Sequence, residues 1–383
     1  MRPSGLLRER IPTSRETWLN YPYSPADDTV GSLLMFLLLP GFVLPGYVLN
    51  TPPRPLQPLR GGVVTALELP GPLADLVGSA PSDVSARSLG QKGVVITGGA
   101  GGVGYAYADE LLGFGHAVVI CDVKDPAAPV EALKAKHGAD AKIFGTPCDV
   151  SKSESVEALG EFAKEKLGTV HYWVNNAGIN GGRRPFTSIP TQMLEAVVNV
   201  NLVGLLLCTK VAIDLMSKQA GVTGHIFQTV GSGVKGGGTP GYVAYGATKR
   251  GLPQLTDSLV KELTAGVPGY DKPEVAGEVC VHTLSPGMVF TDLLLDDSTP
   301  ELRKFPFGVL AAQPPEVAAD LVPKILGVSG QGKKVEFLTT DRVLVKFYQR
   351  FVEGQKSEYI DDDGNVIKKP GSQYADNGVV KQY

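Results

Sequence analysis

A tyrosine and a lysine four positions apart are the clearest candidates for acid–base chemistry in this chain. Tyr245 and Lys249 lie in the run YGATK, and on a helix this spacing places both side chains on one face, one turn apart. A free phenol has a pKa of about 10, and a neighbouring ammonium group favours the phenolate. The pair could therefore exchange a proton with a carbonyl oxygen near neutral pH. Taken alone, the same spacing more often marks a solvated helix face.

A glycine-rich segment provides the second chemical signal. Residues 97–104 read TGGAGGVG, after the apolar run 94–96 and before the helical spacing of 105–112. A strand, a glycine turn and a helix start in this order bring backbone amides close to a pyrophosphate. A second predicted strand, 116–121, is followed by Asp122, whose carboxylate would bond the ribose hydroxyls. The combination predicts a dinucleotide site.

Composition and charge exclude several classes of function. The 383 residues are 43% hydrophobic and carry a formal net charge of −3, which gives no reason to expect a nucleic-acid partner. The four cysteines have no C-x-x-C spacing and are expected to be free, mostly buried thiols. The five histidines are isolated in the sequence, and we therefore expect no metal site.

The first 90 residues differ in texture from the rest and are expected to form an N-terminal extension. Residues 29–53 carry no charge, and their centre reads SLLMFLLLPGFVLPGYVL. This segment is long enough to cross or enter a bilayer, although Pro40 and Pro45 would break a straight helix. A kinked anchor, a re-entrant segment and a cleaved targeting sequence remain open. The stretch 52–89 is rich in proline and glycine, as is typical of a linker.

From residue 91 onward, strand and helix patterns alternate. Such alternation predicts an α/β fold with a doubly wound parallel sheet of about seven strands, a Rossmann fold, over residues 91–340. A C-terminal helix and a polar, extended tail follow over 341–383, and Pro253 should bend the helix that carries Tyr245. The predicted strands are 93–97, 116–121, 142–148, 170–175, 223–230, 279–284 and 334–338. The predicted helices are 102–114, 127–138, 152–167, 189–219, 243–264, 315–327 and 341–352.

With these motifs in this order, the chain resembles the short-chain dehydrogenase/reductase superfamily over roughly residues 90–340. The resemblance implies a hydride transfer between a nicotinamide and a carbonyl or alcohol. In it Tyr245 is the acid, Lys249 tunes it, Ser232 polarises the carbonyl and Asn201 supports a proton-relay water. Ser232 stands thirteen residues before Tyr245, as the superfamily's serine usually does. The resemblance assigns cofactor contacts to Thr97, Gly98, Gly102, Val103, Gly104, Asp122, Asp149, Val150, Asn176, Ala177, Gly178, Tyr245, Lys249, Pro286, Gly287 and Thr291.

A narrower resemblance covers the second half of the chain. The runs GHIF, YGATK, SPGMVFTDLLL, PEVAADLVPKI and YIDDDGN are similar to segments of plant and algal chlorophyll(ide) b reductases. This resemblance implies reduction of the 7-formyl group of chlorophyll b to a hydroxymethyl group, in chlorophyll catabolism. It also implies a chloroplast location, possibly at the thylakoid membrane, and an apolar carbonyl substrate.

Three departures leave alternatives open. Those reductases resemble NADPH enzymes, whereas Asp122 would repel a 2′-phosphate and favours NAD(H); Gly101 offers no compensating cation, although Lys124 is near. Ser232 lies in TVGSG, where those reductases differ, and residues 265–277 look like an insertion. An NAD-dependent dehydrogenase of another apolar alcohol (prenyl, steroid or prostanoid-like) and a non-catalytic dinucleotide-binding scaffold are therefore the rival hypotheses.

Further expectations concern the substrate side and assembly. Leu293, Leu294, Leu295, Phe305 and Phe307 would either line an apolar pocket or belong to the core. Arg183 and Arg184 would either meet an acidic substituent of the substrate or be solvated. The superfamily resemblance implies a homo-oligomer formed through the long helices 189–219 and 243–264.

Overall fold

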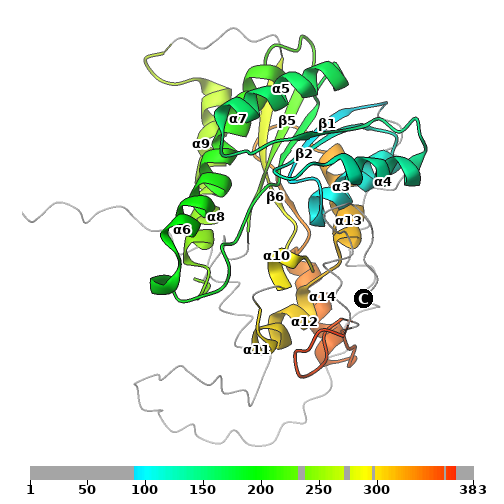
Figure 1. Ribbon diagram of the computed structural model, residues 1–383, viewed down its shortest axis with the longest axis vertical. Coiled ribbons are helices and arrows are strands. Elements are labelled where there is room, and N and C mark those ends of the chain that lie inside the picture. Colours follow the sequence, from blue (N-terminus) through cyan, green and yellow to red (C-terminus); the bar gives the residue numbers. More distant parts are fainter. Residues whose placement is uncertain (1–89, 232–237, 271–276, 296–297, 358, 368–383) are drawn as a thin grey trace, which may run out of the picture. The chain divides into compact units, whose positions relative to one another are not determined.

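The computed structural model describes residues 90–231, 238–270, 277–295, 298–357 and 359–367 (Figure 1). The apolar segment 29–53, the linker and Ser232 lie outside these ranges. Predictions about them therefore remain predictions.

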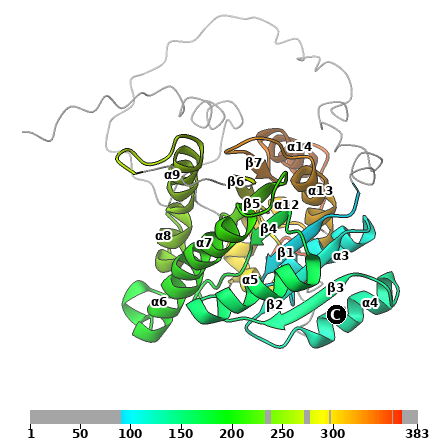
Figure 2. The ribbon, with the colours of Figure 1, turned by 90° about the horizontal axis from the view of Figure 1, so that it is seen from above.

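A parallel sheet of seven strands forms the centre of the described part of the chain. The strand order is β3-β2-β1-β4-β5-β6-β7, so the order reverses between β1 and β4, as in a doubly wound sheet (Figure 2). The predicted fold class and all seven predicted strands are confirmed, with bounds shifted by a residue or two. The strands are β1 (Gly93–Thr97), β2 (Ala117–Asp122), β3 (Ile143–Pro147), β4 (Tyr172–Asn175), β5 (Thr223–Thr229), β6 (Glu278–Ser285) and β7 (Lys334–Glu336).

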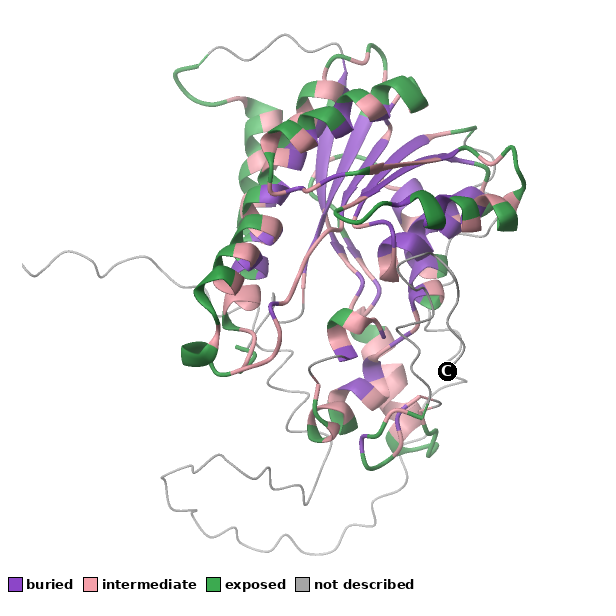
Figure 3. Ribbon diagram, in the orientation of Figure 1, coloured by how far each residue is buried: buried purple, intermediate pink, exposed green. Residues whose placement is uncertain are grey.

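Helices cover both faces of this sheet because alternate strand residues point to opposite sides. On one face Val94 and Ile96 pack with α3 (Gly102–Gly113), α4 (Ala127–His137) and α13 (Pro314–Leu326). On the other face Val95 packs with α5 (Ser153–Leu167), α7 (Leu205–Met216) and α9 (Leu252–Ala265). Figure 3 shows the strands as the buried layer between exposed helix surfaces. The four cysteines are buried and free, as expected.

Two irregularities interrupt the long helices. The predicted helix 189–219 consists of α6 (Thr191–Val198), a π-helical stretch (Asn199–Gly204) and α7. The helix that carries Tyr245 ends as α8 (Val243–Arg250), and α9 begins immediately after Gly251 with Pro253 in its first turn. Pro253 thus lies in the first turn of α9, where proline is tolerated, rather than in a helix interior, and the predicted bend stays a prediction.

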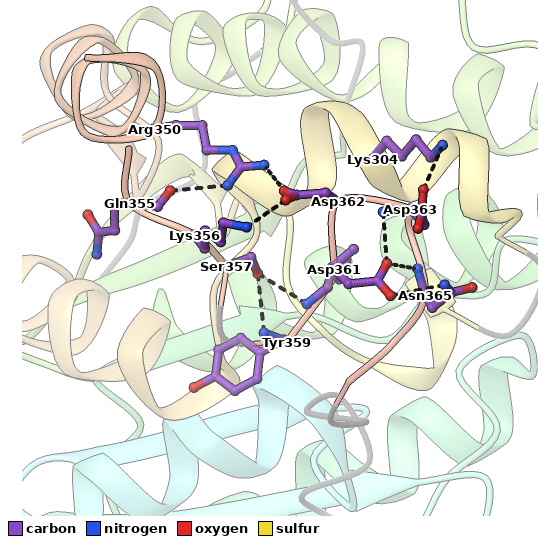
Figure 4. Close-up of polar contacts among 11 residues, drawn as sticks. Lys304, Arg350, Gln355, Lys356, Ser357, Tyr359, Asp361, Asp362, Asp363 and Asn365 are labelled. Carbon is purple, nitrogen blue, oxygen red and sulfur yellow. Dashed lines mark hydrogen bonds and ion pairs between the residues drawn. The ribbon is translucent and has the colours of Figure 1, made fainter. Parts of the chain in front are cut away.

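The C-terminal segment differs from the predicted extended tail. After α14 (Thr340–Phe351), Ile360 and Val366 form an antiparallel bridge. Ile360 is buried in a cluster with Phe290, Leu295 and Phe307. In the turn, Asp362 pairs with Arg350 at 2.6 Å and with Lys356 at 2.8 Å (Figure 4). The prediction of an extended tail was wrong for residues 359–367, because Ile360 is buried in this cluster and Tyr359 packs against it.

One helix in the described residues, Thr191–Met216, is long and apolar enough by length and composition to cross a membrane. It includes α6, the π-helical stretch and α7. Its buried residues, among them Cys208, Ala212 and Met216, pack in the same cluster as Ile226 of β5. This arrangement is that of a helix covering a sheet, so the composition alone gives little support for a membrane span.

Candidate active site

The glycine loop, residues 97–104, is hydrogen-bonded to the Asn176–Gly178 turn that follows β4. The Oγ1 atom of Thr97, which is 1% exposed, accepts hydrogen bonds from the backbone N–H groups of Asn176 and Ala177, both at 3.0 Å. In return the amide of Asn176 donates to the carbonyl oxygens of Thr97 at 3.0 Å and Gly98 at 3.1 Å. The predicted Thr97 contact is therefore a buried bond within the protein that fixes the shape of the loop.

The loop has the space and the free donors that a pyrophosphate needs. Gly98 adopts φ +64° and Gly102 φ +53°, values that favour glycine. A Cβ at Gly104 would lie 2.7 Å from Nδ2 of Asn176, so no side chain fits there. Gly101 caps α3 without a side-chain bond, and the first turn of α3 contains no acidic residue. The N–H groups of this helix start are thus suited to bind phosphate, and the residues present fit a dinucleotide.

Asp122 lies beside this loop at the end of β2. Its Oδ2 accepts the N–H of Ala100 at 3.3 Å, and its Oδ1 accepts the N–H of Lys124 at 3.4 Å. Burial raises the pKa of the carboxyl group, and the backbone N–H groups of Lys124 and Ala100 oppose that rise. The carboxylate therefore contacts the glycine loop through the N–H of Ala100.

The residues expected at the adenine follow β3. Asp149 accepts bonds at Oδ1 from the N–H of Ser151 at 3.0 Å and from its hydroxyl at 2.7 Å, which closes a tight turn. Val150 is buried, and a Cβ at Gly204 would meet its Cγ2 at 2.9 Å. The turn and the π-helical stretch are therefore packed directly on one another.

Tyr245 and Lys249 lie on one helix, α8, as predicted, and both side chains reach the end of β5. Lys249 is 4% exposed and its Nζ donates to the carbonyl oxygen of Thr229 at 2.8 Å. The Nζ atom lies 6.0 Å from the centre of the Tyr245 ring. A Cβ at Gly231 would lie 2.7 Å from the Tyr245 hydroxyl oxygen, so the strand end passes directly beside the phenol.

The pKa of Tyr245 does not shift in the expected direction. Burial raises the pKa of Tyr245 to about 12, and Tyr242 adds to the rise. Burial lowers the pKa of Lys249 to about 8. The expected decrease of the tyrosine pKa fails because desolvation disfavours both charged forms and Lys249 points its Nζ at the Thr229 carbonyl rather than at the phenol oxygen.

Asn201 lies in the π-helical stretch and is fully buried. Its side chain closes a two-way bond with Ile179: Oδ1 accepts the N–H at 2.9 Å, and Nδ2 donates to the carbonyl oxygen at 2.8 Å. Nδ2 also donates to Oγ1 of Thr248 at 3.3 Å, and Thr248 donates to the carbonyl oxygen of Tyr245 at 2.8 Å. Asn201 therefore connects the Asn176–Gly178 turn to the catalytic helix, and π-helical insertions of this kind are frequent at functional sites.

The segment after β6 completes the site. Gly287 adopts φ +74° and packs on Leu338, which turns the chain after Pro286. Thr291 then reaches the glycine loop, since a Cβ at Gly102 would lie 3.4 Å from its Cγ2. Among the apolar residues that follow, only some take the core role that the sequence left open. Leu295 and Phe307 are buried in the core cluster, whereas Leu293 and Phe305 are 44% and 53% exposed.

Two functional contacts were missed because they use groups that a sequence pattern does not mark. The acceptor for Lys249 is the backbone carbonyl of Thr229, and Thr248 joins Tyr245 to Asn201 through its hydroxyl. A groove of about 820 Å³ between α5 and α7 includes none of the predicted site residues.

Comparison with known proteins identifies the family. The sequence model of the short chain dehydrogenase family matches residues 92–301 of this chain. The chain belongs to the short-chain dehydrogenase family. The family membership predicted from the sequence is thus confirmed.

Relatives and solved structures add detail. The chain is 36% identical over 294 residues to the probable chloroplastic chlorophyll(ide) b reductase NYC1 of Arabidopsis thaliana, covering 73% of this chain and 56% of that protein. It is 37% identical over 279 residues to the chloroplastic chlorophyll(ide) b reductase NOL of Oryza sativa subsp. japonica, covering 70% and 78%. The chain thus spans little more than half the length of NYC1. Among solved structures, a 3-ketoacyl-(acyl-carrier-protein) reductase from Brucella melitensis complexed with NADH is 27% identical, with a TM-score of 0.53 over 64% of this chain and 96% of that one.

Proposed function

We propose that this short-chain dehydrogenase reduces the 7-formyl group of a chlorophyll b-type pigment to a hydroxymethyl group. The observation that carries the proposal is the 36–37% identity to two chlorophyll(ide) b reductases over at least 70% of this chain. The aligned segments are longer than the 210 residues of this chain, 92–301, that the family model matches. Short-chain dehydrogenases share the cofactor half, so similarity in the rest is what bears on the substrate.

The residues of the site support this reaction in distinct ways. A bound reduced nicotinamide would supply the hydride. Tyr245 holds its phenolic proton at neutral pH and donates it to the oxygen that gains negative charge. Lys249, fixed on the Thr229 carbonyl, adds positive potential nearby. Asn201 holds the turn and the catalytic helix together, and Ser232, outside the described residues, keeps its predicted role of polarising the carbonyl.

For the cofactor we propose NADH as the preferred reductant. The glycine loop and the start of α3 would hold the pyrophosphate, Val103 lying in the first turn of that helix, with the Asp149–Val150 turn at the adenine. Pro286, Gly287 and Thr291 would hold the nicotinamide amide. Asp122 supports NADH because its carboxylate faces the loop and would repel a 2′-phosphate. NADPH is the alternative that the resemblance to chlorophyll b reductases favours.

Location and assembly complete the proposal. The names of both relatives support a chloroplast location, and residues 29–53 are the candidate membrane segment of an N-terminal extension. The exposed Val203 and Leu206 on the long helix support a homo-oligomer that covers them. An NAD-dependent dehydrogenase of another apolar alcohol remains the second candidate, because Asp122 departs from the pattern of NADPH reductases.

The test is a reduction assay with purified protein, chlorophyll b in dilute detergent, and NADH or NADPH. Formation of the 7-hydroxymethyl pigment, separated by chromatography, supports the proposal. Tyr245→Phe should lower kcat by ~10²-fold or more while cofactor affinity stays near normal, as expected for loss of a general acid. Tyr242→Phe, which removes a hydroxyl from the neighbouring ring 6.4 Å away, is the matched control and should retain most activity. No product with either cofactor would refute the assigned substrate.

A further inference from the structure

Arg183 lies in the loop that follows the Asn176–Gly178 turn, and its guanidinium is incompletely satisfied within the part of the chain that the structure describes. Its Nε atom is buried and has no hydrogen-bond partner, and no ion pair joins its guanidinium to a carboxylate among the residues that the structure describes. A buried donor left without a partner costs about 1–3 kcal/mol, and more when the group is charged. In native proteins such a group is usually completed by a water molecule, an ion or a ligand.

The position of Arg183 is fixed from the side of the catalytic helix. Its side chain lies against Gly241, where a Cβ would come within 2.7 Å of the Arg183 Cγ. The N–H of the next residue, Arg184, donates to the carbonyl oxygen of Gly241 at 3.3 Å. Gly241 stands four residues before Tyr245. The guanidinium is thus held on the segment that leads into the proton donor.

The same loop also contacts the segment that follows Thr291. The amide of Asn180 donates a hydrogen bond to the carbonyl oxygen of Leu293 in α10 (Asp292–Leu295). The loop from Ile179 to Arg184 therefore runs between the two segments that border the substrate side, the start of α8 and α10. The contacts of Arg183 and Arg184 with Gly241 place the guanidinium on the side of α8.

We propose that Arg183 binds a carboxylate of the substrate, so that the enzyme prefers an aldehyde that carries a free acid group over its ester. This inference rests on the proposed function and names its substrate more closely: the free-acid pigment, chlorophyllide b, in place of an esterified chlorophyll b. A planar guanidinium matches a carboxylate with two parallel N–H···O bonds, and an ester offers neither the charge nor the second equivalent oxygen.

Binding measurements test the inference independently of turnover. Equilibrium Kd values are measured for chlorophyllide b and for its methyl ester, in the same dilute detergent, with wild-type protein and three variants. The quantity compared is the ratio of the two Kd values, because partition into detergent affects all four proteins equally. Wild type should bind the acid at least ~10-fold more tightly than the ester, equivalent to about 1.4 kcal/mol.

The variants assign that preference to one side chain. Arg183→Gln should reduce the ratio to near one by weakening the acid and leaving the ester unchanged. Arg183→Lys keeps the charge without the two-pronged geometry and should retain part of the preference. Arg184→Gln removes the same charge one residue away, where no unpartnered buried nitrogen is found, and should retain all of it. Retention of the preference in Arg183→Gln, or its equal loss in Arg184→Gln, overturns the inference.

Turnover of the same two pigments separates the two proposals. If the protein discriminates the acid by binding but reduces neither pigment with NADH or NADPH, the assigned reaction fails while the carboxylate site stands. If it reduces both pigments with equal kcat/KM and equal Kd, the reaction stands and the carboxylate site is refuted.

Discussion

The hydroxyl of Thr97 is expected to stabilise the site more than its small size suggests. It is the common acceptor for two adjacent N–H groups, those of Asn176 and Ala177, and it lies 3.5 Å from the carbonyl oxygen of Val174. Replacement of Thr97 by valine keeps the shape of the side chain and removes only these bonds. Both N–H groups then lose their partner in a partly buried place.

The magnitude follows from the cost of each lost partner. At about 1–1.5 kcal/mol for each partly buried N–H, Thr97→Val should lower the free energy of unfolding by about 2–3 kcal/mol. In a domain of this size one kcal/mol corresponds to a Tm change of roughly 2–4 °C, so a decrease of about 4–12 °C is expected. Thr97→Ser is the matched control: it keeps the acceptor and loses one buried methyl, at a cost of about 1 kcal/mol.

Urea unfolding followed by circular dichroism measures both variants, with cofactor affinity determined in parallel. The midpoint should fall more for valine than for serine. Cofactor affinity should fall for valine alone, because Asn176 also holds the carbonyl oxygens of the glycine loop. If serine destabilises the protein as much as valine does, the methyl rather than the shared acceptor carries the stability, and the argument is wrong.

Two further predictions concern charge. Burial lowers the pKa of His282 to about 3, so the folded protein keeps this histidine neutral while the unfolded chain takes up a proton below pH ~6.5. The contribution of His282 to the free energy of unfolding should therefore be fully present above pH ~6.5 and decrease below it, by about 2 kcal/mol at pH 5. Urea unfolding would show this decrease as a lower midpoint. His282→Asn should make the midpoint less dependent on pH. At the cofactor site, wild type should prefer NADH by ~10-fold or more in kcat/KM. Asp122→Ser should reduce the ratio of kcat/KM for NADH to that for NADPH. Adding Val123→Arg, at a position 71% exposed, should invert this ratio. A wild-type preference for NADPH would contradict the role given to Asp122.

The sheet could be predicted from the sequence because its signals are local. A β-branched run such as Val94–Ile96, followed by glycines with positive φ, has few other folded outcomes. The tail could not be predicted in the same way. The acidic run Asp361–Asp363 predicts a solvent-exposed segment. In the structure, however, Ile360 is buried, and Gly364 packs so closely on Pro300 that a Cβ would have no room. Which isolated apolar residue finds a partner depends on long-range packing that periodicity does not report.

For the site as well, local sequence patterns predicted the helix that carries the residues but not their long-range contacts. The spacing of Tyr245 and Lys249 predicted that both lie on one helix, and both lie on α8. It could not give the acceptor of Lys249, because any backbone carbonyl can serve and the sequence does not mark one. It also could not give the balance between desolvation and attraction, since that balance depends on burial at each atom.

That balance bears on the direction of the proposed reaction. With its pKa raised to about 12, Tyr245 is protonated at neutral pH and is ready to donate. An alkoxide is a stronger base than this phenolate, because its conjugate acid, an alcohol, is about as weak an acid as water. Proton transfer to the reduced oxygen is therefore downhill. The reverse reaction needs the phenolate, which the buried site disfavours at the same pH.

Lys249, whose pKa is lowered to about 8, is still mostly charged at neutral pH and loses that charge as the pH rises. Raising the pH would thus create the base needed for oxidation only while it removes the cation that would stabilise it. At neutral pH the resting site therefore holds the protonation states that carbonyl reduction uses, a protonated Tyr245 beside a charged Lys249.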